Sequence, residues 1–363
     1  MNFLFEKNKM KNRLSNPSQK DIDKMSYQYA LFLANMKKFF PLKNQEEYKK
    51  FYIDLLYHKW LSGIEQYYVK FLRRSVITNN SSYNLDDLTF EKPLIFATFH
   101  LGSYRLFNSF LFEKGFKIVL IIDESVYIRQ QSDILENVKP LLEKKNSSDI
   151  IILNVKDKAS IFKLKNLINQ GYVMSVYLDG NTGLTKDDEE FSKSYIPISF
   201  FSNEVYVKNG VGKLASLLGA DIIPVISHRD EKEINHIEFY KEITMSDFDG
   251  KKDFAVKSIE KVYQIFEKKL AEYPVQWESW LYLHRWIKRD YTTDFNSVTN
   301  LKNEFNVDRY TFFKVKESHF LFDLFDYKSY PLSAEQYKNL YNRNFTEIDD
   351  NQREELILKN VIV

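Results

Sequence analysis

The chain has 363 residues, no cysteine, and 52 Lys and Arg against 50 Asp and Glu, a formal net charge of +2. The lack of cysteine excludes disulfide bonds, thiolate nucleophiles and Cys-ligated zinc, and the near balance of charge points to neither nucleic acid nor an anionic membrane as a partner. No apolar run reaches the roughly 18 residues of a membrane span, so we expect a soluble, cytoplasmic protein, with peripheral membrane contact left open.

Residues 1–88 are predicted to form a helical N-terminal segment. Apolar and aromatic side chains recur at three- and four-residue spacing through residues 20–75, which is the spacing of helices with one buried face. The polar stretch "TNNSSYNLDD" (78–87) then separates this segment from the rest of the chain.

Residues 89–290 have the pattern of an α/β domain. Short apolar runs with little polar alternation are typical of strands buried on both faces, and amphipathic segments lie between them. We therefore predict a mixed, mostly parallel central sheet flanked by helices. The strand candidates are 94–99, 117–123, 149–155, 172–178, 221–227 and 238–243, and the helix candidates are 103–115, 134–145, 159–171, 210–220 and 253–274.

Residues 291–363 are predicted to form a small α+β unit. "RYTFFKVKESHFLFDLFDY" (309–327) has the pattern of a β-hairpin, and residues 333–342 and 350–360 have helical patterns. The arrangement resembles, faintly, the small peptide-binding domains of peptide-modifying enzymes. That resemblance implies a peptide acceptor held by strand addition; a unit that only packs against the rest of the chain is the alternative.

Several common chemistries have no motif in this sequence. The six histidines form no HExxH pair, and the chain has neither a Walker loop nor a Gly-x-Ser-x-Gly elbow. "GVGKLA" (210–215) matches a loose dinucleotide fingerprint, but it does not follow the first strand of a βαβ unit, so close helix packing is the preferred interpretation. "KDDEE" (186–190) is interpreted as a solvated charge run. We expect no metal and no cofactor.

His100 is the strongest candidate for chemistry. It ends the apolar run "LIFATF", and open α/β sheets bind ligands at the carboxyl ends of their strands. An imidazole there can act as a general base, and Gly102 would allow close approach of backbone N–H groups to a substrate. Asp179, Gly180 and Asn181 end another such strand at the same edge of the sheet. A structural histidine and a simple turn are the respective alternatives.

Three sequence blocks resemble the lysophospholipid acyltransferase-like superfamily, in its bacterial lipid A lauroyl/myristoyl acyltransferase branch. They are "HLGSYR" (100–105), "YLDGNTG" (177–183) followed by "YIPISFFSNEVYVKNGVGKLASLLGADIIPVISHR" (195–229), and "EYPVQWESWLYLHRWI" (272–287). The blocks are collinear, and the likeness spans roughly residues 90–290.

The resemblance implies transfer of a fatty acyl chain from an acyl carrier protein or coenzyme A thioester to an acceptor, with His100 as general base. It places Asp179 in the loop beside the site. Members of that branch usually carry an N-terminal membrane helix, and none is evident here, so the expected acceptor is soluble rather than a membrane glycolipid. The residues expected to bind substrate are Gly102, Ser103, Tyr104, Arg105, Gly180, Asn181 and Arg229.

Arg105 departs from the family pattern, because it stands where members have Glu or Asp. A guanidinium has only donors, so it cannot hold the imidazole tautomer as a carboxylate does, and a nearby positive charge lowers a histidine pKa. Three explanations remain open. Asp179 or Asp123 supplies the carboxylate, Arg105 binds an anionic group such as a phosphopantetheine phosphate, or catalysis is lost.

We therefore predict an acyltransferase that acts on a hydroxyl or amine of a lipid or peptide acceptor. Backbone N–H groups near Gly102 or Gly180 would stabilise the oxyanion. The main alternative is a non-catalytic protein of the same fold that binds acyl chains, lipids or carrier protein, and a hydrolase is a third option.

Overall fold

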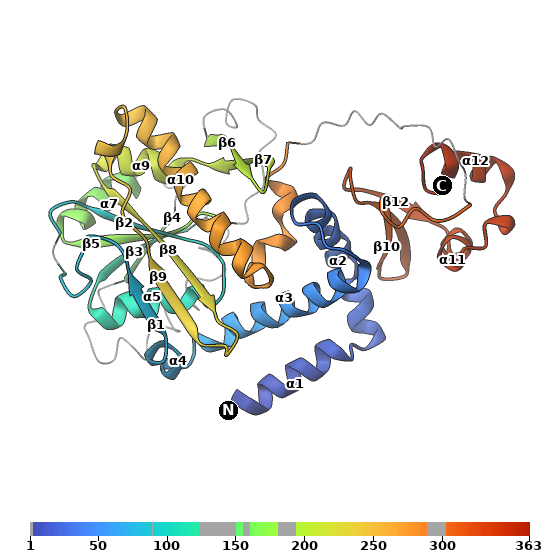
Figure 1. Cartoon of the computed structure of the whole chain (residues 1–363), viewed down its shortest axis with the longest axis horizontal. Helices are drawn as coiled ribbons and strands as arrows, with labels where there is room; N and C mark the ends of the chain where they lie inside the picture. Colours follow the sequence, from blue (N-terminus) through green and yellow to red (C-terminus); the bar gives the residue numbers. More distant parts are fainter. Residues whose placement is uncertain (1–2, 89, 123–149, 155–159, 181–193, 289–302) are drawn as a thin grey trace. The chain divides into compact units, whose positions relative to one another are not determined.

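A seven-stranded sheet is the centre of the larger of two compact units (Figure 1). The structure, a computed structural model, describes residues 3–88, 90–122, 150–154, 160–180, 194–288 and 303–363. Neighbouring strands are parallel, except that β8 and β9 are antiparallel. The predicted mixed, mostly parallel sheet is thus confirmed. The strand order is β1 (Val76–Asn79), β9 (Asn235–Phe239), β8 (Asp221–Arg229), β2 (Leu94–Thr98), β5 (Tyr172–Tyr177), β3 (Lys117–Ile122) and β4 (Ile150–Asn154).

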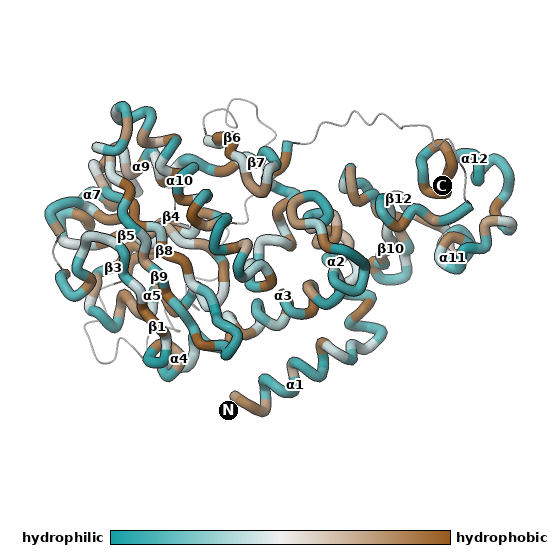
Figure 2. Tube along the Cα trace, in the orientation of Figure 1, coloured by the Kyte–Doolittle hydropathy of each residue, from teal (hydrophilic) through white to brown (hydrophobic). Residues whose placement is uncertain are grey.

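The central strands are buried along their whole length. Every residue of β2 and every residue of β8 is buried, as expected for strands that have helices on both faces. Figure 2 shows hydrophobic stretches, in brown, among the strands of this sheet. Apolar side chains removed from water stabilise a fold by about 25 cal/mol per Å², so the buried apolar residues of these strands contribute to its stability.

Helices cover both faces of the sheet. On one face, Phe107 of α5 packs against Phe96 of β2, with ring centroids 5.7 Å apart. On the other face, Phe266 of α10 stacks on Phe99, just after β2, at 3.8 Å. The described α-helices that lie wholly in this unit are α4 (Val69–Arg73), α5 (Tyr104–Lys114), α7 (Ser160–Asn169), α9 (Gly210–Leu218) and α10 (Lys251–Glu272).

Gly212 explains the loose dinucleotide fingerprint. Helices α9 and α10 pack closely, and a Cβ atom on Gly212 would collide with the backbone carbonyl of Ala255 in α10. The glycine is therefore required by helix packing, which confirms the preferred interpretation of this motif.

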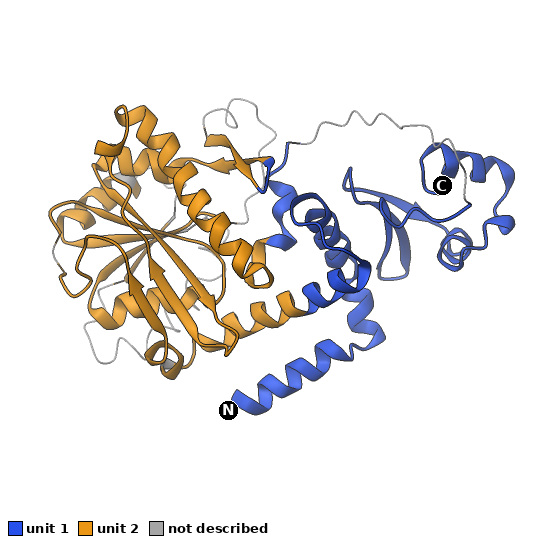
Figure 3. Ribbon diagram, in the orientation of Figure 1, with its two compact units in different colours: residues 1–53, 201–203, 280–363 blue, residues 54–200, 204–279 orange. Residues whose placement is uncertain are grey.

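The smaller unit contains residues 1–53, 201–203 and 280–363 (Figure 3). It holds α1 (Phe3–Ser15), α2 (Gln19–Phe39), a three-stranded antiparallel sheet of β10 (Tyr310–Val315), β11 (Ser318–Asp323) and β12 (Lys328–Leu332), then α11 (Ala334–Asn342) and α12 (Asp350–Leu358). Strand β10 packs on α2, where Ser26 Oγ accepts a hydrogen bond from Lys314 N at 3.0 Å. The predicted boundaries at residues 88 and 290 stay predictions.

Helix α3 (Gln45–Glu65) belongs to both units, because the division falls between residues 53 and 54. A two-stranded hairpin, β6 (Tyr195–Phe200) and β7 (Asn203–Lys208), completes the described strands. Short 3-10 helices lie at Met245–Asp247, Pro274–Gln276, Glu278–Leu281, Leu283–Arg285 and Phe345–Glu347. Within the described residues, no helix combines the length and apolar character needed to cross a membrane.

Some predicted elements differ from the structure. The strand predicted at 238–243 is observed as β9 at 235–239. Buried and partly buried residues alternate along β9, so no continuous apolar run marks its bounds. Two edge strands were not predicted: β1 of the seven-stranded sheet, whose four residues are all exposed, and β12 of the three-stranded sheet, which carries a proline. The helix candidate at 134–145 lies outside the described residues.

Candidate active site

His100 and Asp179 meet at the carboxyl edge of the sheet. Strands β2 and β5 are parallel neighbours, and Thr98 pairs with Tyr177. His100 and Asp179 each follow two residues later, so the register of the sheet brings them opposite each other. The strand-end argument made from the sequence is therefore correct for these two residues.

A short hydrogen bond joins the two side chains. His100 Nδ1 lies 2.7 Å from Asp179 Oδ1, and the backbone N–H of His100 donates to Asp179 Oδ2 at 2.9 Å. A carboxylate can only accept, so the proton of a neutral imidazole resides on Nδ1. Nε2 is then left with a lone pair, and it makes no hydrogen bond to any described residue.

Asp179 is buried but well supplied with donors. Its side chain is 0% exposed, and Oδ2 also accepts from Trp277 Nε1 at 2.7 Å and Ser279 Oγ at 3.2 Å. Burial raises the pKa of the Asp179 carboxyl, but the charge of His100 and the hydrogen bonds from His100 and Trp277 outweigh it. The resulting pKa is below its ordinary value, so Asp179 is a carboxylate at neutral pH.

Asp179 also raises the pKa of the His100 imidazole. Burial lowers the pKa of His100, but the charge and hydrogen bond of Asp179, with a smaller contribution from Glu278, raise it above its ordinary value of 6.5. Arg105 acts in the lowering direction, as the sequence indicated, but it is the weakest of these influences. Asp179 thus supplies a carboxylate beside the imidazole, which is the first of the three explanations that the sequence left open.

Two tyrosine rings enclose the imidazole without sealing it. Tyr177 stacks on His100 with ring centroids 4.8 Å apart, and Tyr104 lies edge-on at 4.6 Å. Asn108 fixes Tyr177 by donating to its hydroxyl oxygen at 2.9 Å. The His100 side chain is still 27% exposed, so a substrate can reach it.

Gly102 serves backbone packing rather than substrate approach. Its φ of +55° favours glycine, and a Cβ atom there would lie 2.7 Å from His228 Cα of β8. The N–H of Gly102 already donates to Gln276 O at 3.2 Å. The N–H of Gly102 itself is thus already engaged, and an oxyanion donor near Gly102 or Gly180 stays a prediction.

Ser103 and Arg229 are structural rather than substrate-binding. Arg229 is 0% exposed, and its guanidinium donates to Glu65 at 2.9 Å and to Ser103 Oγ. Ser103 is 1% exposed and donates to the same carboxylate. A buried arginine needs such partners, and a substrate has no access to either side chain. These two predictions of substrate binding are corrected.

The remaining predicted residues have different outcomes. Gly180 is exposed directly after Asp179, and Arg105 lies with its guanidinium 4.5 Å from the centre of the Tyr104 ring. Asn181 and the alternative carboxylate Asp123 lie outside the described residues. The roles proposed for Gly180, Tyr104 and Arg105 remain predictions.

The sequence analysis missed several contributors to the site. Trp277 and Ser279 lie in the third sequence block but received no role there. Glu278 pairs with Lys59 at 2.7 Å, and the lysine comes from α3, far away in the chain. Burial raises the pKa of Glu278, but Lys59 and His100 lower it further, to a net value below the ordinary one. The signal available for Trp277, Glu278 and Ser279 was their place in "QWES" of the third sequence block.

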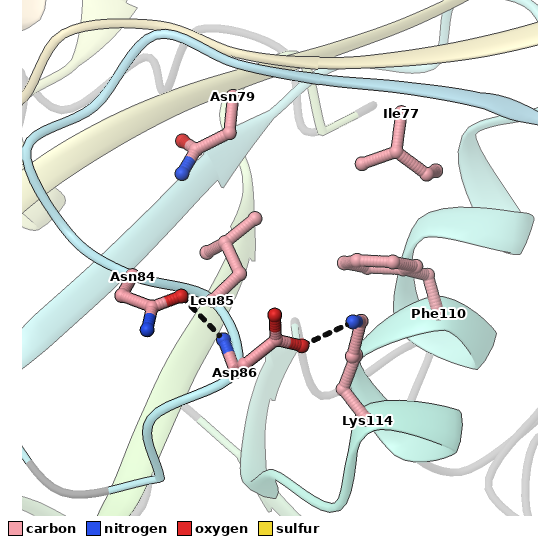
Figure 4. A pocket seen from close by; sticks show the side chains of 7 residues that line it. All are labelled: Ile77, Asn79, Asn84, Leu85, Asp86, Phe110 and Lys114. Atoms are coloured by element: carbon pink, nitrogen blue, oxygen red, sulfur yellow. Dashed lines mark hydrogen bonds and ion pairs between the residues drawn. The ribbon is translucent and has the colours of Figure 1, made fainter.

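A pocket of about 230 Å³ lies elsewhere on the same unit (Figure 4). Helix α5 begins beside His100 and ends at Lys114 in this pocket, where Lys114 pairs with Asp86. The pocket contains none of the predicted site residues. Its lining residues are Ile77, Asn79, Asn84, Leu85, Asp86, Phe110 and Lys114.

The fold and the site together define an α/β protein with a His–Asp pair at the carboxyl edge of a mostly parallel sheet. Within the described residues, no group of three His, Asp or Glu side chains could hold a metal ion.

Comparison with known proteins finds distant structural likeness only. No family model matches the chain, and no curated protein matches it. Among solved structures, it is similar to the 1-acyl-sn-glycerophosphate (LPA) acyltransferase PlsC from Thermotoga maritima, at 13% sequence identity and a TM-score of 0.31. The alignment covers 73% of this chain and 97% of that chain. A likeness this weak assigns neither family nor activity.

Proposed function

We propose that this protein transfers an acyl group from an acyl thioester, carried by acyl carrier protein or coenzyme A, to a hydroxyl or amine, with His100 as general base. One observation carries the base assignment: the 2.7 Å contact between His100 Nδ1 and Asp179 Oδ1. It fixes the ring proton on Nδ1 and leaves Nε2, on a part-exposed ring, as the atom that accepts a proton.

The reaction follows from this geometry. Nε2 takes the proton from the acceptor O–H or N–H while the acceptor atom forms a bond to the thioester carbonyl carbon. The tetrahedral intermediate then collapses, the C–S bond breaks, and the thiolate leaves with the proton returned by the imidazolium. Asp179 stabilises that imidazolium through its negative charge. The proposed oxyanion donor is the N–H of Gly180, which donates to no described residue.

The choice of acyl transfer rests on the sequence blocks. A His–Asp pair serves many proton transfers, but "HLGSYR", "YLDGNTG" and "EYPVQWESWLYLHRWI" resemble acyltransferase motifs. The structure supports the use of these blocks as one site, because His100, Asp179 and Trp277 come from the three blocks and contact one another.

The main argument for the non-catalytic alternative is weakened. It rested on Arg105, which removed the carboxylate expected beside the base. The contact of Asp179 with His100 Nδ1 supports the proposal that Asp179, from another strand, takes that role in spite of Arg105.

The direct test is turnover of acyl thioesters. Lauroyl- and palmitoyl-coenzyme A would be incubated with the full chain, with and without glycerol as a hydroxyl acceptor, and released thiol followed with a thiol reagent. Because the chain has no cysteine, the reagent reports only the substrate thiol. Product analysis separates acyl transfer from hydrolysis.

Two variants decide the assignment. His100→Ala should abolish thiol release, whereas His236→Gln, on β9 of the same sheet and outside the site, should retain it. Unchanged turnover in His100→Ala would overturn the base assignment. Binding of acyl thioester without any turnover would favour the non-catalytic alternative.

A further inference from the structure

Arg105, beside the proposed base, is a cation that pairs with no carboxylate in the part of the chain that the structure describes. Its guanidinium lies over the Tyr104 ring and donates to Ser62 Oγ of α3 at 3.3 Å. The Tyr104 ring in turn contacts His100. Within the described residues, Arg105 makes no ion pair, and its side chain is partly withdrawn from water. A charge in such a place is unfavourable unless an anion compensates it.

The neighbouring carboxylates are already engaged. Asp179 accepts from His100, and Glu278 pairs with Lys59. Lys59 and Arg105 balance these two carboxylates while the imidazole is neutral. When His100 accepts a proton, the group carries one positive charge in excess. The oxyanion that forms on the substrate in the same step balances that charge, so an anion at Arg105 would act by binding and positioning the substrate.

The neighbourhood of Arg105 suits a phosphate. A guanidinium presents a planar fork of donors that binds phosphate oxygens in pairs. Lys59 lies three residues before Ser62, which Arg105 contacts, and residues at that spacing share a helix face. Helix α3 thus brings a second cation toward the same side of the site, although that lysine also holds Glu278.

We infer that Arg105 binds a phosphate group of a substrate and so positions that substrate beside His100. The inference rests on the function proposed above. The phosphate has two possible sources, the phosphopantetheine arm of the thioester donor or a phosphate on the acceptor. In either case, the phosphate contributes to the affinity for the substrate and to its position beside His100.

Kinetics with matched substrates test the inference. The donor arm compares lauroyl-S-phosphopantetheine with lauroyl-S-pantetheine. The acceptor arm keeps the phosphate-free donor and compares glycerol 3-phosphate with glycerol. A charge-assisted hydrogen bond contributes enough for about a 10- to 100-fold preference in kcat/KM, and we expect that preference in one arm. The arm that shows it identifies the source of the phosphate.

Variants connect the preference to Arg105. Arg105→Gln should remove it by slowing only the phosphorylated substrate, and Arg105→Lys should restore part of it. Lys114→Gln, at the opposite end of the same helix, should leave it unchanged. Thermal melting of each variant verifies folding. A preference of the same size in Arg105→Gln, or none in either arm for the parent protein, would overturn the inference.

Equilibrium binding separates this inference from the proposed function. Calorimetry would compare phosphopantetheine with pantetheine, and glycerol 3-phosphate with glycerol, in the parent and Arg105→Gln. Tighter binding of a phosphorylated ligand that Arg105→Gln loses supports the anion site even if no thioester is turned over. Equal binding of the members of both pairs by the parent rejects the site whatever the turnover.

Discussion

Asp179→Asn is the sharpest test of the His–Asp pair, because it changes charge and hydrogen bonding with almost no change in shape. In the structure, Oδ2 of Asp179 faces three donors: the backbone N–H of His100 at 2.9 Å, Trp277 Nε1 at 2.7 Å and Ser279 Oγ at 3.2 Å. The amide oxygen of an asparagine must take this position. Its NH₂ group then faces His100 Nδ1.

This orientation reverses the imidazole tautomer. An NH₂ group donates, so Nδ1 must accept and the ring proton moves to Nε2. Nε2 can then no longer take a proton from the acceptor. A tautomer reversal of this kind lowers kcat by about 10⁴ in serine proteases, which corresponds to about 5.4 kcal/mol at about 1.36 kcal/mol per factor of ten.

The assay is kcat for thiol release at saturating acyl thioester. Asp179→Asn should fall by about three to four orders of magnitude, whereas Asp86→Asn, an exposed aspartate beside the separate pocket, should match the parent. Melting curves must show that Asp179→Asn is folded. A folded Asp179→Asn whose kcat is within about tenfold of the parent would refute the tautomer argument.

Three further outcomes are expected. Because the pKa of His100 is raised and the base must be neutral to act, kcat/KM should increase with pH along an acid limb centred above pH 6.5; a limb below that value would contradict the role of Asp179. Glu65→Gln leaves the Arg229 guanidinium buried without a counter-charge, so urea denaturation should show a loss of about 3–5 kcal/mol, and a loss below about 1 kcal/mol would show that the pair is not needed. Gly212→Ala should destabilise by about 1–3 kcal/mol through the clash with α10, whereas Gly210→Ala, whose Cβ meets open space, should melt like the parent; equal melting of the two variants would contradict the close helix packing.

The sequence predicted the sheet well because its central strands are unusually apolar. β2 and β8 are buried on both faces, so their composition alone identifies them. β1 escaped prediction because its four residues are exposed and it exists only by pairing with β9. Such a strand depends on long-range hydrogen bonding, which local composition does not report.

The site was predictable in part for the same reason. His100 and Asp179 end apolar strands, so their shared edge could be inferred, but their contact depends on β2 and β5 being neighbours. Arg229 shows the limit of strand-end reasoning. Arg229 also ends a strand, yet it forms a buried ion pair with Glu65 of α3. No local pattern connects residues 164 positions apart.

The segment from Gln276 to Ser279 holds the site through four consecutive residues. Gln276 O accepts from Gly102 N, and Glu278 N donates to His100 O, both at 3.2 Å, while the side chains of Trp277 and Ser279 donate to Asp179. Backbone and side-chain contacts thus alternate along the segment. An insertion or deletion of one residue within the segment would displace all four contacts together. We therefore expect the length of this segment to vary far less among related chains than the exposed surface does.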